Sequence, residues 1–355
     1  MTYKETLFFI AKCLTVSLEK KNKEIILTKL KSQKIDWEKF VKLSTNHLVL
    51  PAIYCNFQRS DLLNHLPKDL VSYMKQITSI NRNRNKQIIK QAKTLNKLLL
   101  KNDIKPIFLK GTGNLLSDLY VDVSERMVGD IDFIFSEKDY FKAIKLLRNN
   151  GYSDSKNYKY SSLKTRHYKR IKKKNNIAAV EIHHSLLPEK YANEFNYKIV
   201  QKNCQVINGI NVLSHEDNLN LSIISCQIND DGFYFKTINL RNAYDVYLLS
   251  KQTNAQKSLS KFEMLKNPLN CFLATCYVTF GNIESLQYNK TKKAENYLSI
   301  FDSLILSDKK RKFIIKLKKG VLFVQSRLEI IFKSIYSKEH RDWILNRTNK
   351  GRNWD

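Results

Sequence analysis

Two short segments of the chain carry acidic residues where apolar residues would be expected. Asp130 and Asp132 lie two residues apart in 130–135, where acidic and apolar residues alternate before the segment becomes apolar, and this pattern predicts a β-strand. Their carboxylates therefore project from the same face, roughly 7 Å apart along the strand. Glu181 interrupts a second predicted strand, 178–183, and a charge in an apolar strand is unexpected unless it points into a site.

These three acids have the chemistry of a divalent metal site. Neighbouring carboxylates repel each other, so they persist at low cost only where water solvates them or a cation bridges them. Mg²⁺ is the usual cation for one or two carboxylates together with phosphate oxygens, and Mn²⁺ accepts the same ligands. Asp130, Asp132 and Glu181 together could hold two such ions and stabilise an in-line displacement at phosphorus. His183 shares the strand face of Glu181, where it either supports the site by a hydrogen bond or is merely packed or solvated.

A glycine-containing turn precedes the two aspartates by about twenty residues. Lys110, Gly111, Thr112 and Gly113 follow a short apolar strand expected at 106–109 and come just before a helical stretch. Backbone N–H groups and the Thr112 hydroxyl at such a turn could cradle a triphosphate, with Lys110 as a cation. A plain strand-to-helix turn explains the spacing equally well, and it is the combination with the acids that favours the phosphate interpretation.

The elements that must position these residues form an α/β segment between two helical regions. Residues 1–100 are expected to be helical, residues 101–215 to form the core, and residues 216–355 to be helical again. In the first region Asp36 is the expected N-cap of a helix that ends near Pro51, and apolar residues at helical spacing predict one long helix over 77–100.

Within the core, helices are expected between the two strands and after the second one. The helical stretches are 114–120 and 139–149, the latter stopped by Gly151. A basic hairpin is expected over 165–184, and Asn-Gly at the centre of 206–212 predicts a second hairpin with a type I′ turn.

The charge of the chain allows two interpretations. There are 62 Lys and Arg against 33 Asp and Glu, a net charge of +29, which either reflects an AT-rich coding sequence or is the footprint of a polyanionic partner. Residues 156–174 contain nine Lys or Arg and no acid, with tyrosines interleaved, so they could track a nucleic acid or another acidic partner. A solvated edge strand protected by lysines is the alternative. A second basic run, 309–319, alternates with apolar residues as one face of an ordinary amphipathic helix does.

Composition also bears on location. No stretch approaches the ~18 consecutive apolar residues of a membrane-spanning helix, so we expect a cytoplasmic protein with no membrane partner. The six cysteines form no C-x-x-C pair, which fits buried thiols in a reducing compartment better than a zinc site or a disulfide framework.

Several of these motifs together resemble a known family. The residues that carry the resemblance are Leu109-Lys110-Gly111, Leu119-Tyr120, Arg126, Gly129-Asp130-Ile131-Asp132, Gly151-Tyr152 and Val180-Glu181-Ile182-His183. They are similar to the uncharacterised bacterial nucleotidyltransferase family of the DNA polymerase beta-like nucleotidyltransferase superfamily. The resemblance is specific over about residues 35–185 and vague after that.

The resemblance implies a polymerase-beta-like α/β (α+β) core, with a small mixed sheet and helices on one side. It also implies transfer of a nucleoside monophosphate from an NTP to an acceptor hydroxyl, an EC 2.7.7 type of reaction. Asp130 and Asp132 would be metal ligands, and Glu181 would orient a metal or accept the proton of the acceptor. Gly111 and Thr112 would stand where the wider superfamily has a Gly-Ser pair that holds the β- and γ-phosphates.

Arg126, four residues before Asp130, would neutralise triphosphate charge, and its alternative is an ordinary surface arginine.

A rival function belongs to another class of protein. A catalytically weak antitoxin-like or regulatory protein could keep the fold and use its basic surface to bind protein or RNA. The retention of all three acids favours the enzyme. The sequence fixes neither the NTP nor the acceptor, which could be a small molecule, a protein or a nucleic acid.

Overall fold

A seven-stranded mixed sheet carries the acidic residues, which confirms the α/β class. The computed structural model describes residues 1–32, 34–155 and 166–350. The strands follow the order β3-β4-β5-β2-β1-β7-β6 across the sheet. Their bounds are β1 (Ile107–Leu109), β2 (Asp130–Ile134), β3 (Tyr152–Asp154), β4 (Ile171–Lys173), β5 (Ala179–His183), β6 (Gln205–Ile207) and β7 (Ile210–Val212).

The central strand β2 separates the acids from the hydrophobic core. It pairs antiparallel with β1 and parallel with β5, and the latter register sets Asp132 beside Glu181. Because side chains alternate along a strand, Asp130 and Asp132 share one face while Ile131 and Phe133 share the other. Ile131 and Phe133 are completely buried, so the register of β2 is fixed by its apolar face.

The first helix of the core differs from the expectation at both ends. The helix expected over 114–120 is α6 (Lys110–Leu116), which begins and ends four residues earlier because the turn residues themselves are helical. α7 (Glu137–Asn149) occurs where expected, and Gly151 after it has a φ of +84° that suits glycine. A short helix, α8 (Tyr197–Lys202), precedes the second hairpin. In that hairpin Asn208 and Gly209 both have positive φ, as the type I′ turn requires.

The N-terminal region is helical. Asp36 caps α3 by accepting a hydrogen bond from the backbone N–H of Lys39, as expected. The long helix predicted over 77–100 begins earlier, at residue 68, because Leu70 and Met74 extend its buried face. The helices are α1 (Tyr3–Cys13), α2 (Lys20–Lys31), α3 (Trp37–Asn46), α4 (Leu50–Arg59) and α5 (Lys68–Leu100).

α5 packs along the core and directs polar residues inward. The apolar Ile80 is 57% exposed, whereas the polar Asn81 and Asn85 are buried. Their side-chain amides donate hydrogen bonds to backbone carbonyls of the segment that leads into β2, including that of Arg126. Near the other end of α5, Gln91 exchanges hydrogen bonds with the backbone of Ala178, just before β5. The helix therefore holds the starts of both acid-bearing strands.

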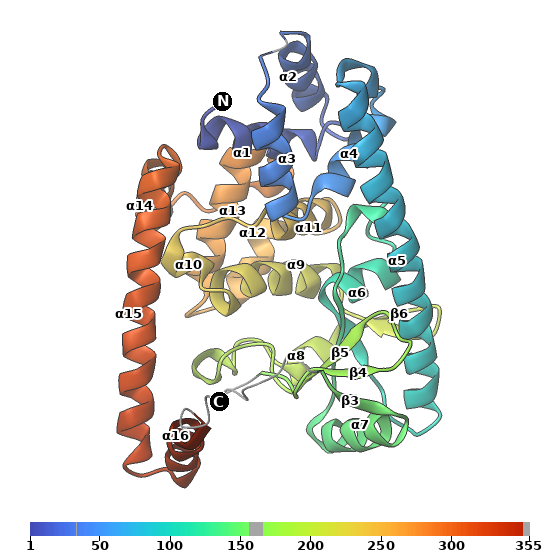
Figure 1. Cartoon of the computed structure of the whole chain (residues 1–355), viewed down its shortest axis with the longest axis vertical. Coiled ribbons are helices and arrows are strands. Elements are labelled where there is room, and N and C mark those ends of the chain that lie inside the picture. Colours follow the sequence, from blue (N-terminus) through green and yellow to red (C-terminus); the bar gives the residue numbers. More distant parts are fainter. Residues whose placement is uncertain (33, 156–165, 351–355) are drawn as a thin grey trace.

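The C-terminal region is helical and includes a π-helical turn, Ser225–Asn229. Figure 1 shows most of it between the N-terminal helices and α15, which lies along the outside of the molecule on the side away from α5. Among the helices of the described residues, none is long and apolar enough to cross a membrane. The bounds are α9 (His215–Ile224), α10 (Gly232–Phe235), α11 (Leu240–Ser250), α12 (Ala255–Ser258), α13 (Lys266–Phe280), α14 (Lys292–Ile305), α15 (Asp308–Ser334) and α16 (Lys338–Lys350).

Buried polar contacts join the three regions. Arg126 of the core donates a 2.9 Å hydrogen bond to Asp245 of α11, which also accepts one from Tyr120 at 2.7 Å. The neighbouring Glu125 accepts hydrogen bonds from Arg59 of α4 and Tyr244 of α11. The division into units at 1–100, 101–215 and 216–355 stays a prediction, and these contacts favour cooperative unfolding of all three.

Replacing Asp245 with Asn should strongly destabilise the protein. The change leaves the buried Arg126 guanidinium without its counter-charge, which typically costs about 3–5 kcal/mol in the free energy of unfolding. Asp302→Asn is the matched control, because Asp302 forms an exposed ion pair with Lys4 that is worth about 1 kcal/mol or less. Urea unfolding measures both variants, and equal losses of stability would contradict a structural role for the buried pair.

Candidate active site

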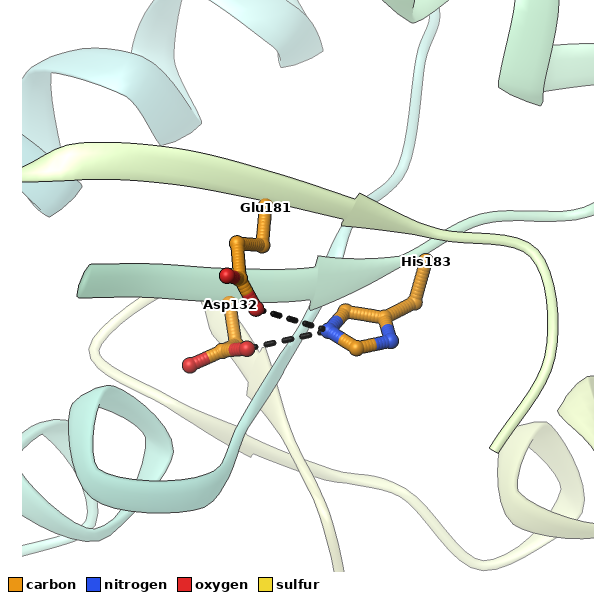
Figure 2. Close-up of side chains that lie close together, drawn as sticks. All are labelled: Asp132, Glu181 and His183. Carbon is orange, nitrogen blue, oxygen red and sulfur yellow. Dashed lines mark hydrogen bonds and ion pairs between the residues drawn. The ribbon is translucent and has the colours of Figure 1, made fainter. Parts of the chain in front are cut away.

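The closest group of metal-ligating side chains joins the two central parallel strands. Asp132 of β2 and Glu181 and His183 of β5 each offer one ligand atom, and these atoms all lie within 4.8 Å of one another. The Nε2 atom of His183 lies 2.9 Å from a carboxylate oxygen of Asp132 and 3.7 Å from one of Glu181 (Figure 2). The ring of His183 is 1% exposed. His183 was expected either to support the site by a hydrogen bond or to be merely packed or solvated, and the structure favours the hydrogen bond to the acids.

Lys110 supplies the positive charge that these acids need. Its Nζ atom donates a 2.6 Å hydrogen bond to Asp132 and lies 3.8 Å from Glu181 and 3.3 Å from Nε2 of His183. Lys110 stands at the junction of β1 and α6 with a φ of +51°, a backbone region that a residue with a side chain rarely adopts. Such strain persists only where the surroundings enforce it, and it is common at functional sites.

The electrostatics of the group follow from this arrangement. Burial alone would raise the pKa of Asp132, but the Lys110 ammonium and the hydrogen bond with His183 hold it far below its usual range. Burial alone would lower the pKa of Lys110, and the charges of Asp132 and Glu181 outweigh it and raise the pKa. Asp132 and Lys110 are therefore a carboxylate and an ammonium ion at neutral pH.

Asp130 lies on the same face of β2 but has its own partner. Its carboxylate accepts a hydrogen bond from Arg170, just before β4. Burial raises the pKa of Asp130, and the guanidinium of Arg170 opposes this rise. The structure thus brings Asp132 and Glu181 together directly, whereas Asp130 would join them at a metal only after it separates from Arg170.

The glycine-containing turn is packed inside the protein. A Cβ on Gly111 would lie 2.9 Å from the side chain of Val128, and one on Gly113 would lie 2.9 Å from the carbonyl oxygen of Phe108. The hydroxyl of the buried Thr112 donates a 2.8 Å hydrogen bond to the carbonyl of Asp130. Close packing of α6 on the sheet therefore accounts for both glycines, and the Thr112 hydroxyl serves to attach α6 to β2.

Arg126, expected to meet a triphosphate, is 6% exposed and paired with Asp245. Burial would lower the pKa of its guanidinium, but the Asp245 carboxylate raises it. The alternative, an ordinary surface arginine, is wrong because the side chain is buried, whereas the role of Arg126 toward a triphosphate stays a prediction. Its geometry is that of a structural ion pair between the core and α11.

Two other arginines lie within electrostatic range of Asp230 but form no ion pair among the described residues. Arg166 and Arg241 are partly buried, and within the described residues neither guanidinium has an ion pair. Burial lowers the pKa of Arg166 and, together with the charge of Arg126, lowers that of Arg241 to about 10. Asp230, after the π-helical turn, lies within electrostatic range of both and of Lys110, although burial raises its pKa. Sequence analysis missed Arg241 and Asp230 because no local motif marks them.

The basic stretch 156–174 is described only from residue 166 onward, and 156–165 lie outside the described residues. Arg166 and Arg170 turn toward the acids, whereas Lys172, Lys173 and Lys174 are exposed. β4 is the second strand from the edge, since β3 covers it. A solvated edge strand is therefore not the explanation of these lysines.

The donor set fits an oxygen-preferring divalent ion. The carboxylates of Asp132 and Glu181 are ligands that Mg²⁺ and Mn²⁺ prefer. The hydrogen bond from His183 would hold Asp132 in place, as partners of metal-binding carboxylates commonly do. The Lys110 ammonium occupies the space between these ligands, so a metal ion has to compete with it.

Replacing Lys110 with Met should strengthen the binding of Mn²⁺ in the absence of nucleotide. The variant keeps a long side chain but removes the competing charge, which gives a gain of about fivefold or more in affinity. Lys105→Met is the matched control, because Lys105 is exposed before β1 and should leave the affinity unchanged. Calorimetric titration with MnCl₂ tests this. An unchanged or weaker affinity in Lys110→Met would show that the Lys110 ammonium does not compete with the metal ion.

Comparisons with known proteins bear on the same region. A family model described as an uncharacterised nucleotidyltransferase matches residues 33–280. JHP933 from Helicobacter pylori is similar in structure with a TM-score of 0.31 and 16% identity, over 67% of this chain and 97% of that one. A second H. pylori structure, described as a candidate nucleotidyltransferase, gives 0.32 and 18%, over 66% and 96%. No curated protein matches the chain. Because the family match spans most of the chain, including both acid-bearing strands, the protein belongs to this family of uncharacterised nucleotidyltransferases.

Proposed function

We propose that the protein is a metal-dependent nucleotidyltransferase that moves a nucleoside monophosphate from an NTP to an acceptor hydroxyl. The observation that carries the proposal is the convergence of Asp132, Glu181 and His183 around the Lys110 ammonium, in a chain of nucleotidyltransferase ancestry. Two carboxylates held this close repel each other, and this repulsion is costly unless a cation lies between them. In the proposed site a divalent metal ion would therefore take the place of the Lys110 ammonium.

Asp132 and Glu181 are the proposed metal ligands, with Asp130 as a third after it leaves Arg170. Mg²⁺ or Mn²⁺ bound there supplies positive charge to the triphosphate and lowers the energy of the displacement at phosphorus. Asp132 suits a ligand rather than a base, because its lowered pKa makes it a weak proton acceptor. Glu181, whose side chain is more exposed than that of Asp132, is proposed to accept the proton of the acceptor hydroxyl.

The triphosphate has a proposed set of cationic contacts beside the acids. A metal ion held by Asp132 and Glu181 would displace the Lys110 ammonium, which could then bind a phosphate oxygen. Arg166 and Arg241, which have no ion pair among the described residues, can donate planar hydrogen bonds to the same group. The nucleotide-binding role expected of Gly111 and Thr112 would use their backbone N–H groups in the first turn of α6, because the Thr112 hydroxyl is engaged.

The charge of the surface near Glu181 indicates one class of acceptor. A nucleic acid is one candidate, since Lys172, Lys173 and Lys174 form an exposed basic group one strand away from Glu181. We propose no more specific acceptor.

Removing either metal ligand should abolish nucleotidyl transfer while the fold is retained. In the parent, ATP with MgCl₂ at one hundred times the dissociation constant should raise the free energy of unfolding by about 2.7 kcal/mol. Asp132→Asn and Glu181→Gln keep the side-chain shape, and each should lose this stabilisation and at least about a hundredfold in rate. The assay follows label from α-³²P NTPs in cell extract, and melting curves follow binding.

Glu24→Gln serves as the matched control because it removes an exposed acid of α2 outside this group, so it should behave as the parent does. A parent that shows neither transfer nor a stability shift with any NTP, Mg²⁺ or Mn²⁺ would overturn the enzyme. The antitoxin-like or regulatory function would then take its place.

Arg166→Ser should weaken NTP binding more than it slows the chemical step. A lost charged hydrogen bond to phosphate corresponds to a roughly tenfold or larger increase in KM for the NTP. Lys169→Ser, which removes an exposed positive charge three residues away, is the control and should leave KM nearly unchanged. Equal effects in the two variants would indicate general electrostatic attraction and would exclude a specific phosphate contact of Arg166.

A further inference from the structure

Helix α15 has no buried side chain over its whole described length, Asp308–Ser334. It contacts the rest of the protein at few points. Lys318 donates a 2.7 Å hydrogen bond to the carbonyl of Tyr234, and the Arg311 guanidinium lies 4.2 Å from the ring centroid of Tyr3. A helix of this kind gains most of its stability by burying an apolar face, and the described residues, α14 and α16 included, leave the apolar side chains of α15 largely exposed.

Five exposed apolar residues of α15, together with Ile335 at its C-cap, form one continuous stripe, and the exposed Phe323 lies outside it. Successive members are separated by four or three residues, which places them on one side of the helix. Each is between 49% and 73% exposed. We call this set the apolar stripe, and it consists of Leu317, Val321, Val324, Leu328, Ile331 and Ile335.

Phe313 and Phe332, which are 62% and 63% exposed, widen the stripe at its two ends. At 100° per residue these eight residues span about 100° of the helix, and from residue 313 onward this apolar arc contains no charged residue. Contiguous apolar surface of this kind marks an interaction site.

The rest of α15 is strongly basic. The helix contains nine Lys or Arg and only two acids, Asp308 and Glu329, for a net charge of +7. On the helical wheel Lys309 and Arg327 border one side of the arc, and Lys318 borders the other. An apolar face flanked by lysines and arginines is the pattern of helices that lie in the interface of a membrane.

We propose that α15 binds an anionic lipid surface, with the apolar stripe inserted among the headgroups and exposed basic side chains such as Lys309 paired with lipid phosphates. The helix would lie parallel to the membrane rather than cross it. Figure 1 shows α15 along the outer side of the molecule, so the sheet would stay away from the lipid. The proposal departs from the expectation of no membrane partner, which rested on spanning segments alone.

Charge favours lipid over a second copy of α15. Two such helices side by side would bring two charges of +7 together, with too few acids to pair them. The arc is also wider than the narrow a/d seam of a coiled coil, because it includes Phe313 and Phe332. An anionic bilayer offers negative charge to the basic side chains and an apolar region that can accept the whole arc.

Sedimentation of the full chain with vesicles tests the proposal. We expect binding to phosphatidylcholine vesicles containing phosphatidylglycerol and at least about tenfold weaker binding to phosphatidylcholine alone. Leu328→Glu places a charge on the apolar stripe and should weaken binding to the anionic vesicles by roughly tenfold or more. Ser326→Glu adds the same charge at an exposed position on the opposite side of the helix and should weaken binding by less than about fivefold.

Three outcomes would overturn the proposal. The parent binding neither vesicle would do so, and equal losses in the two glutamate variants would indicate charge attraction without insertion. Light scattering that shows a parent dimer converted to a monomer by Leu328→Glu, with no vesicle binding, would assign the stripe to a second copy. Circular dichroism of both variants confirms that the helix content is kept, since both positions are exposed.

Discussion

The parallel pairing of β2 with β5 forces two carboxylates together, and the rest of the site depends on how that repulsion is compensated. Asp132 and Glu181 are opposite each other in this register, so neither can move away without breaking the centre of the sheet. Lys110 provides the compensation, and its strained backbone fixes where β1 ends and α6 begins. α6 then packs so tightly on the sheet that Gly111 and Gly113 leave no room for side chains. One electrostatic requirement thus shapes the strand, the turn and the helix.

A second layer of polar contacts keeps that arrangement rigid. The segment 123–128 leads directly into β2, and its carbonyls are held by Asn81 and Asn85 of α5. Its charged residues are held from other sides, Glu125 by Arg59 and Tyr244, and Arg126 by Asp245. Because each partner comes from a different part of the chain, displacement of any one region would disturb the strand that bears Asp132. This explains why the strand that bears Asp132 depends on helices before and after the core.

Local patterns in the sequence predicted the local structure well. The two acid-bearing strands, the Asn-Gly hairpin and the N-cap at Asp36 all depend on residues near one another in the chain, and the structure confirms them. The partners of charged residues were not predictable in this way, because Asp245 is 119 residues from Arg126. Arg170 is an intermediate case. In the β4–β5 register Ile171 pairs with Val180, so Arg170 and Glu181 share the opposite face, which a register argument on the expected hairpin could have shown.

The net charge of +29 acquires a meaning only when each basic residue is placed. Lys110 and Arg170 are paired with acids of the proposed site, and Arg126 with one inside the protein, so the charges of these three are compensated within the chain. Arg166 and Arg241 have no ion pair among the described residues, and both lie within electrostatic range of Asp230. The charge of α15 flanks an exposed apolar stripe instead. The net charge does not separate these three situations. The burial and the ion pairs of each basic residue show whether it compensates an internal acid, is available to a ligand, or lies on the surface. Composition alone therefore left nucleic acid and compositional background equally open.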